Sequence, residues 1–350
     1  EKGAQELLNK SNIQIKNIEQ IVSDSDIIFV PIQTPHDAKY EGITRIPDER
    51  KDFDYEFLKK GVKDLSDEIE KQGKDKVVVI ISTVLPGTIR TYIKPILSKH
   101  VKLCYNPYFI AMGTTIDDFL GAEINLFGVD DKEAASKAEE FYKTVNKAPF
   151  FKTTIENAEL IKVGYNTFIS TKIAMINTLM ETCHNLPNTN IDDISRAFAL
   201  CDTRLISDKY LYGGMGDGGG CHPRDNIALS YLAKKLNVSY NWYEGIMAQR
   251  EKQTDWLADL IISEKFEMDI NILGKCFKPE TNLTLGSPSI LLKNILEERG
   301  EKVKMWDPYV DSLDMKKVSQ EMEWETKPQL FFIGTKHEAF KHFYFYPNSV

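Results

Sequence analysis

The chain has 350 residues, 42% hydrophobic and 27% charged, which is the balance of a folded globular protein. This length predicts two or three domains, with room for a cleft between them. The net charge of -8 argues against a nucleic-acid partner. The sequence contains no run of about eighteen apolar residues, so we predict no membrane-spanning helix. The charged opening EKGAQELLNK also lacks the apolar core of a signal peptide, so we expect a cytoplasmic protein.

Short apolar runs alternate with polar helical stretches in residues 1–147. The runs are DIIFVPI (26–32), VVVIIS (77–82), VKLCYN (101–106) and INLFGV (124–129). Val, Ile and Phe with little alternation are typical of strands buried on both faces. This region is therefore expected to form a parallel sheet with crossover helices.

Residues 148–262 carry little strand signal, and from about Glu156 apolar residues recur three and four apart, as in AELIKVGYNTFISTKIAMINTLMETC. Alternation of strands and helices resumes in residues 263–350, with INILGKCF, SPSILLKNILEERG, KVKMWDP and LFFIGT. We predict an α/β protein in which a central helical region joins two Rossmann-like, parallel-sheet domains.

Polar residues follow two of the predicted strands, at Gln33–Pro35 and Ser82–Val84. A doubly wound sheet binds nucleotides beyond the carboxyl ends of its strands, so these residues could hold a cofactor. Taken singly, Thr-Pro and Ser-Thr are also ordinary turn and cap residues, and both interpretations stay open. No G-x-G-x-x-G follows a predicted strand, because the glycine-rich residues 213–220 lie in the helical region.

Lys162 and Asn166 stand one helical turn apart in an otherwise apolar helix. Burying a lysine and an amide without partners is costly, which suggests a functional pair. The alternative is an exposed polar stripe, and spacing alone does not decide between them.

Cys221 follows the glycines in GGMGDGGGCHPRD, and Pro223 and Asp225 suit the first turn of a helix that begins just after it. A thiol near a helix N-terminus is favoured as the thiolate, so Cys221 is a candidate nucleophile. The alternatives are a small buried residue for Cys221 and a first-turn acid for Asp225. The five cysteines lack a C-x-x-C or zinc-type spacing, so we predict neither a disulfide framework nor a metal site.

The motifs together resemble the nucleotide-sugar dehydrogenases, the UDP-glucose/GDP-mannose 6-dehydrogenase family. The resemblance rests on STVLPGT, NPYFIAMGTT, AELIKVGYN, LCDTR, GDGGGCHPRD and LGKCFKPETNLTLGSPS, which occur in the family's order. It implies an NAD-binding domain at 1–147, a central dimerisation region with catalytic residues at 148–262, and a nucleotide-sugar-binding domain at 263–350. The implied assembly is a homodimer.

Members of this family oxidise the C6 alcohol of the sugar to a carboxylate, using two NAD+ and no metal. By the resemblance, Cys221 would add to the intermediate aldehyde, and the thiohemiacetal would become a thioester that water hydrolyses. Lys162 and Asn166 would stabilise the oxyanion and hold the water, which Asp225 and Thr83 would order.

The resemblance also assigns the binding residues. NAD would contact Ile32, Gln33, Thr34, Pro35, His36, Ser82, Thr83 and Val84. The nucleotide sugar would contact Tyr108, Phe109, Ile110, Ala111, Lys162, Asn166, Arg204, Tyr212, Gly216, Gly218, Phe277 and Lys278. Arg204 would reach the sugar nucleotide of the neighbouring subunit, and the glycines before Cys221 would form a pliable wall around the sugar.

This chain also departs from the family pattern. EKGAQELL resembles the segment after the family's second strand, and PNSV stops before a further strand and a substrate arginine, so both sheet domains are expected to be incomplete. Without the glycine loop, NAD would lose its pyrophosphate cradle, and the alternative function is a non-catalytic nucleotide-sugar-binding remnant. Tyr108 and Met112 replace two acids, and Leu285 replaces an arginine, which leaves the sugar and the nucleotide base open.

Overall fold

A computed structural model describes residues 3–185, 187–202, 210, 212–237, 241–312, 315–321, 323–343 and 345–350. The chain forms two compact units, which we describe separately: residues 1–35 with 52–165, and residues 36–51 with 166–350. Helix α6 (Ile155–Asn185) belongs to both units, because the boundary falls after Tyr165. The division into three domains at 1–147, 148–262 and 263–350 stays a prediction.

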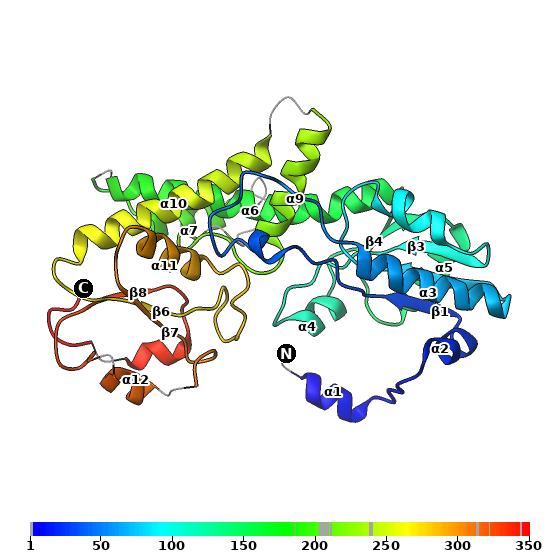
Figure 1. The fold of residues 1–350 in the computed structure, drawn as a ribbon, viewed down its shortest axis with the longest axis horizontal. Coiled ribbons are helices and arrows are strands. Elements are labelled where there is room, and N and C mark those ends of the chain that lie inside the picture. Colours follow the sequence, from blue (N-terminus) through cyan, green and yellow to red (C-terminus); the bar gives the residue numbers. More distant parts are fainter. Residues whose placement is uncertain are drawn as a thin grey trace. The chain divides into compact units, whose positions relative to one another are not determined.

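The first unit contains a sheet with strand order β1-β2-β3-β4-β5, of which β1, β3 and β4 are labelled in Figure 1. The strands are β1 (Ile27–Val30), β2 (Lys76–Ile80), β3 (Val101–Tyr105), β4 (Asn125–Val129) and β5 (Phe150–Thr153). Every residue of β2 is buried, as expected for a central strand covered on both faces. The predicted α/β class and the four predicted strands of this region are confirmed.

Helices surround this sheet, and one of them supplies much of the core on one face. Ala134, Ala138 and Tyr142 of α5 (Lys132–Lys143) pack against Val79 of β2 and Phe127 of β4. The remaining helical elements of the unit are α1 (Ala4–Lys10), α2 (Ile18–Asp24), α3 (Glu56–Gln72), η2 (Ile89–Ile93), η3 (Lys94–Ile96) and α4 (Thr115–Leu120).

The sheet is mostly but not entirely parallel. Strands β3 and β4 pair antiparallel, with Cys104 opposite Val129, whereas the neighbouring pairs are parallel. The sequence predicted parallel strands throughout, because a strand buried on both faces has the same apolar pattern in either direction. Strand β5 was missed, since Phe151 is exposed and no apolar run marks it.

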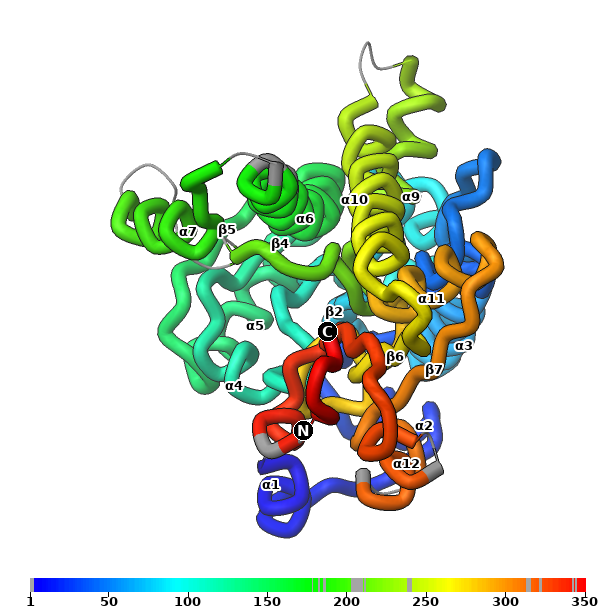
Figure 2. Tube along the Cα trace, turned by 90° about the vertical axis from the view of Figure 1, so that its left-hand side faces the viewer, coloured from blue at the N-terminus to red at the C-terminus, as the bar shows by residue number. Residues whose placement is uncertain are grey.

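The second unit joins long helices to a smaller sheet. Its sheet has the order β7-β6-β8 and is parallel, as the sequence predicts. The strands are β6 (Ile270–Leu273), β7 (Val303–Trp306) and β8 (Leu330–Ile333), and the helical elements after α6 are α7 (Ile191–Ala199), α9 (His222–Lys235), α10 (Trp242–Glu264), α11 (Pro288–Glu298), α12 (Met315–Glu321) and η4 (Glu338–His342). Helices α9 and α10 lie side by side (Figures 1 and 2), and α10 also packs against α11. Among the described residues, no helix combines the length and the apolar character needed to cross a membrane.

A segment between β1 and α3 belongs to the second unit, which the sequence did not predict. Residues 36–51 leave the first sheet, and Tyr40 of η1 (Ala38–Tyr40) packs against Ile227 of α9 and Met247 of α10. Asn294 of α11 donates a hydrogen bond to the carbonyl of Ile43. This segment therefore becomes part of the surroundings of α9, the helix that starts after Cys221.

Candidate active site

Cys221 lies at the N-terminus of α9, as the sequence predicts. It is the residue before the first helical residue, and the backbone N–H of Asp225 donates to its carbonyl at 2.8 Å. Pro223 lies in the first turn, where a missing N–H leaves no helical hydrogen bond unmade. The thiol is half-buried beside the positive end of a fourteen-residue helix, which favours an anion there.

Two of the predicted catalytic residues meet directly in the second unit. The side-chain Nδ2 of Asn166 donates to Oδ2 of Asp225 at 2.5 Å, and the Asp225 side chain is completely buried. Arg224 lies 3.2 Å from the other carboxylate oxygen. One turn further along α6, the Ser170 hydroxyl lies 3.1 Å from Nδ1 of His222. Helix α6 thus presents polar groups to the first turn of α9, where a buried acid requires them.

The glycines before Cys221 pack closely against the loop after β6. A Cβ on Gly218 would lie 2.7 Å from Cβ of Phe277, and one on Gly219 would lie 3.0 Å from the Phe277 ring. Gly219 also has a φ of 82°, in the left-handed region. The structure therefore brings together Gly218 and Phe277, both predicted to contact the substrate.

Side chains from two helices hold this glycine segment in place. Asn177 of α6 accepts a hydrogen bond from the N–H of Gly214 and donates one to the carbonyl of Met215. Gln253 of α10 donates to the carbonyl of Gly214. Both side chains are almost fully buried. Neither was identified from the sequence, because a lone amide in a helix carries no signal of its distant partner.

Arg250 of α10 joins three segments of the second unit. Its guanidinium donates to the carbonyls of Asp217, Gly42 and Gly286, at 3.2, 2.9 and 3.0 Å. Oδ1 of Asp217 lies 2.8 Å from Nε of Arg250, with both side chains buried. Because the single Nε–H points at the Asp217 carbonyl, the contact with the carboxylate is electrostatic. Arg250 was also missed from the sequence.

In the first unit, the predicted NAD-binding loops follow adjacent parallel strands and bond to each other. The Thr34 hydroxyl donates to the carbonyl of Thr83 at 2.7 Å, and the Ser82 hydroxyl donates to the carbonyl of Ile32. Val84 is buried, whereas Gln33 is exposed and Thr83 is half-buried. The two loops, residues 32–35 and 82–84, thus form one hydrogen-bonded surface at the carboxyl edge of the sheet, which we call the ledge.

His36, the last residue predicted for this ledge, belongs to the second unit. Burial, with Arg224 and Lys51 nearby, lowers the pKa of His36 to about 3. The imidazole is therefore neutral at physiological pH.

Glu159 of α6 fixes the loop that contains Thr83. Its carboxylate accepts the backbone N–H of Gly87 at 2.6 Å and that of Ile89 at 2.8 Å. Burial raises the pKa of Glu159 to about 7, although the two N–H donors favour the ionised form. Glu159 is part of the motif AELIKVGYN, but nothing in that motif distinguishes it from an ordinary helix acid.

Lys162 of the first unit lies next to a pair of aromatic rings. Its Nζ lies 5.3 Å from the centre of the Phe109 ring, which meets the Tyr165 ring edge to face. The Lys162 side chain is buried, so the predicted exposed stripe does not describe it. The Tyr108 hydroxyl accepts a hydrogen bond from Tyr142 at 2.6 Å, within the core of the unit.

The other predicted substrate residues are less enclosed. Ile110 and Ala111 are exposed, as is Tyr212, whereas Gly216 and Lys278 are half-buried. Arg204 lies outside the described residues. Lys162 and Thr83 belong to the first unit, and Cys221 belongs to the second. The surroundings of each residue are therefore described within its own unit only.

Comparison with known proteins identifies the family. Residues 1–146 match the model for the NAD binding domain of the UDP-glucose/GDP-mannose dehydrogenase family, and residues 156–250 match the model for its central domain. The chain belongs to this family. NAD is the cofactor that the family's first domain binds.

Individual relatives agree with this assignment. UDP-glucose 6-dehydrogenase TuaD of Bacillus subtilis is 30% identical over 301 residues, covering 83% of this chain and 61% of the relative. GDP-mannose 6-dehydrogenase of Pseudomonas aeruginosa is 27% identical over 305 residues, covering 84% of this chain and 66% of the relative. The chain thus spans less than two thirds of the length of either relative.

A solved structure shows that the fold is shared. The UDP-glucose dehydrogenase from the hyperthermophilic archaeon Pyrobaculum islandicum superposes with a TM-score of 0.82, over 97% of this chain and 79% of that chain, at 22% identity. Two Rossmann-like regions joined by helices are therefore the fold of this dehydrogenase-family chain.

Proposed function

We propose that this chain catalyses the NAD-dependent oxidation of the C6 alcohol of a nucleotide sugar to a uronic acid, with Cys221 as the nucleophile. Membership in the dehydrogenase family supports the reaction class. The observation that carries the proposal is the hydrogen bond of Asn166 to the buried Asp225, one helical turn from Cys221. A thiol, an amide and an acid in this order suit covalent capture of an aldehyde followed by hydrolysis.

In the proposed reaction, C6 is oxidised twice, and Cys221 is bonded to C6 during the second oxidation. Oxidation of the alcohol removes a hydride and a proton and leaves an aldehyde at C6. The Cys221 thiolate adds to that carbon, and the thiohemiacetal loses a second hydride to become a thioester. Water then attacks the thioester, the thiolate leaves, and the product is the carboxylate. NAD+, when bound, accepts the hydride of each oxidation, so two NADH form for each sugar.

Lys162, Asn166 and Asp225 would act on the oxygen atoms of this sequence. In the proposal, the buried ammonium of Lys162 and the amide of Asn166 stabilise the oxyanion that forms when the thiolate or water adds to C6. Asp225 is held as an acceptor by Asn166 and Arg224, which suits it to orient the hydrolytic water. Thr83 would order the same water from its own loop.

In the proposal, part of an NAD molecule binds at the ledge of the first unit. Gln33 and Thr83 present polar groups beyond the carboxyl ends of β1 and β2, where dinucleotides lie in this fold. Thr34 and Ser82 instead tie the two loops together. Ile32, Pro35 and Val84 would supply apolar contacts, and the neutral His36 would bring no charge to the dinucleotide.

The proposed active form is a homodimer. On α6, Phe168 and Met175 stand two turns apart and are 51% and 46% exposed, and Trp242, which is 50% exposed, donates to Thr171 between them. Exposed apolar groups in a row on one helix are typical of a surface that a second helix covers. Arg204 would reach the sugar nucleotide of the other subunit.

Counting NADH tests the proposal. The chain is incubated with excess NAD+ and limiting UDP-glucose, GDP-mannose or a UDP-N-acetyl sugar, and NADH is measured at completion. We expect two NADH for each molecule of the true substrate. Cys221→Ser cannot form a thioester and should yield at most one, whereas Cys201→Ser, which changes an exposed cysteine, should still yield two.

NADH production together with the melting temperature separates this proposal from the alternative function. A non-catalytic remnant would bind a nucleotide sugar, seen as a rise in melting temperature, yet produce no NADH. Two NADH from the Cys221→Ser variant would contradict the role of the thiol while leaving the dehydrogenase activity intact.

A further inference from the structure

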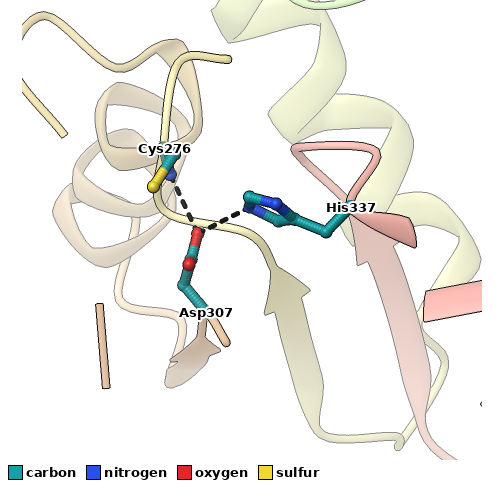
Figure 3. Close-up of side chains that lie close together, drawn as sticks. All are labelled: Cys276, Asp307 and His337. Carbon is teal, nitrogen blue, oxygen red and sulfur yellow. Dashed lines mark hydrogen bonds and ion pairs between the residues drawn. The ribbon is translucent and has the colours of Figure 1, made fainter. Parts of the chain in front are cut away.

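Three buried polar side chains meet where the strands of the second sheet end (Figure 3). Cys276 follows β6, Asp307 follows β7 and His337 follows β8, and each is at most 1% exposed. The carboxyl ends of adjacent parallel strands bring them together. Their possible ligand atoms lie within 4.8 Å of one another, which resembles a metal site. The hydrogen bonds of the three side chains show whether these atoms are available to a metal.

The histidine is fully engaged by the chain itself. The backbone N–H of Glu280 donates to Nδ1 of His337 at 3.0 Å. Nδ1 is therefore the acceptor, and Nε2 carries the proton, which it donates to Oδ2 of Asp307 at 3.0 Å. With both ring nitrogens used, the imidazole has no lone pair directed at a metal.

Asp307 and the Cys276 thiol also have hydrogen-bond partners within the chain. Oδ2 of Asp307 also accepts the N–H of Lys275 at 2.6 Å and that of Cys276 at 3.1 Å. Although burial opposes ionisation, the N–H groups of Tyr309 and Lys275 hold the pKa of Asp307 below its ordinary value. Burial raises the pKa of Cys276 to about 12, and its thiol donates to the carbonyl of Thr281 at 2.9 Å. Asp307, His337 and the Cys276 thiol therefore all bond to the backbone of residues 275–281, and we call these three side chains the clasp.

The clasp fastens the loop of residues 274–284 at several points. Asp307 holds its first residues, His337 holds Glu280, and the N–H of Phe277 donates to the carbonyl of Leu283 at 3.0 Å. Phe277 projects from this loop onto Gly218 and Gly219, just before Cys221. The position of Phe277 therefore depends on the clasp, although neither Asp307 nor His337 reaches the glycines.

We propose that Asp307 and His337 are positioning residues, which hold Phe277 and Lys278 in place for binding the nucleotide sugar. This inference rests on the proposed function for its ligand, but the clasp itself does not. In this proposal the clasp orders the loop of residues 274–284, and this role requires no metal.

Isosteric variants of the full chain test this inference. Asp307→Asn turns one accepting oxygen into an amide donor that faces backbone N–H groups. His337→Gln keeps a donor near Asp307 and loses the acceptor for Glu280, whereas His337→Asn keeps the acceptor and loses the donor. Asp269→Asn is the matched control, because Asp269 precedes β6 at the opposite end of the sheet and pairs with the surface residues Lys304 and Lys327.

Two readouts are measured for each variant. Amide hydrogen exchange over residues 274–284 should be about ten- to hundredfold faster in Asp307→Asn than in the unaltered chain, because a hydrogen bond to a charged group is lost. Affinity for whichever of UDP-glucose, GDP-mannose and the UDP-N-acetyl sugar the unaltered chain binds, measured by titration calorimetry, should fall by about tenfold or more. In His337→Asn the exchange of the Glu280 amide should change least, and the Asp269→Asn control should match the unaltered chain in both readouts.

Four results would overturn parts of the inference. Unchanged exchange in Asp307→Asn would refute the clasp. Faster exchange with unchanged affinity would refute the positioning role. Stoichiometric zinc in the purified unaltered chain, lost in His337→Asn, would show a metal site instead. If the unaltered chain bound none of UDP-glucose, GDP-mannose and the UDP-N-acetyl sugar, the proposed function would fail, and the exchange data would still decide whether the clasp holds the loop.

Discussion

Replacing the buried Arg250 by methionine should destabilise the second unit more than a single change at its surface. The residue is 3% exposed, and its guanidinium supplies donors to carbonyls of Asp217, Gly42 and Gly286. Methionine is an unbranched side chain that can follow the same path. It leaves the three carbonyls without this donor and leaves the Asp217 carboxylate buried without its cation.

The expected cost follows from these losses. Removing one member of a buried ion pair costs about 3–5 kcal/mol. Each carbonyl left without its donor adds about 1–3 kcal/mol if water does not reach it, and these contributions are not additive. We therefore expect the free energy of unfolding to fall by about 4 kcal/mol or more, a large part of the roughly 5–15 kcal/mol that stabilises a typical protein.

Urea unfolding of a double-mutant cycle measures this effect. Asp217→Asn alone should cost less, because Arg250 keeps its three carbonyl acceptors. Arg250→Met combined with Asp217→Asn should cost less than the sum of the single changes, since the unpaired buried charge is then absent. Arg299→Met is the control, because Arg299 pairs with Asp255 and Asp259 at the surface and should contribute under about 1 kcal/mol. A cost below about 1 kcal/mol for Arg250→Met, or strictly additive changes, would refute the reasoning.

Three further predictions concern individual side chains. Gly218→Ala should lower the free energy of unfolding by about 1–3 kcal/mol because its Cβ would overlap Phe277, whereas Gly214→Ala, with open space around it, should be close to neutral in urea titrations. Between pH 4.5 and 7 the folded state keeps a proton on Glu159 that the unfolded state releases, so this group's contribution to stability falls by up to about 3 kcal/mol as the pH rises. Glu159→Gln should therefore lose less stability than the unaltered chain between pH 5 and pH 8, and an identical pH dependence would contradict the raised pKa. Asn166→Asp places a second carboxylate against the buried Asp225, and we expect it to destabilise the chain more at pH 8 than at pH 5 in the same measurement.

Features set by nearby residues were predicted correctly from the sequence. The buried strands, the long helix α6 and the helix that begins after Cys221 depend on apolar periodicity and on first-turn residues such as Pro223. These signals lie within a few residues of the structure they specify. The proximity of Asn166 to Asp225 was reached through the order of motifs in a known family, because spacing alone left both residues with ordinary alternatives.

Features set by distant partners could not be predicted. The antiparallel direction of β4 depends on the path of the connection before it, and the burial pattern of a strand does not record direction. The docking of residues 36–51 depends on Tyr40 finding a site more than 180 residues away in the sequence, next to Ile227. Arg250, Gln253 and Asn177 look like ordinary helix residues until the carbonyls that they serve are known.

The glycines before Cys221 show how these long-range contacts change an interpretation. The family resemblance implied a pliable wall here, and glycine permits many backbone conformations. Asn177 and Gln253 instead bond the backbone of Gly214, Arg250 bonds that of Asp217, and Phe277 packs against Gly218. Because the glycines lack side chains, Phe277 can pack closely against their backbone, and these contacts restrict the motion of the segment. A segment held in this way would present Cys221 at one fixed position, and in the proposed reaction this would favour attack on a single carbon of the sugar.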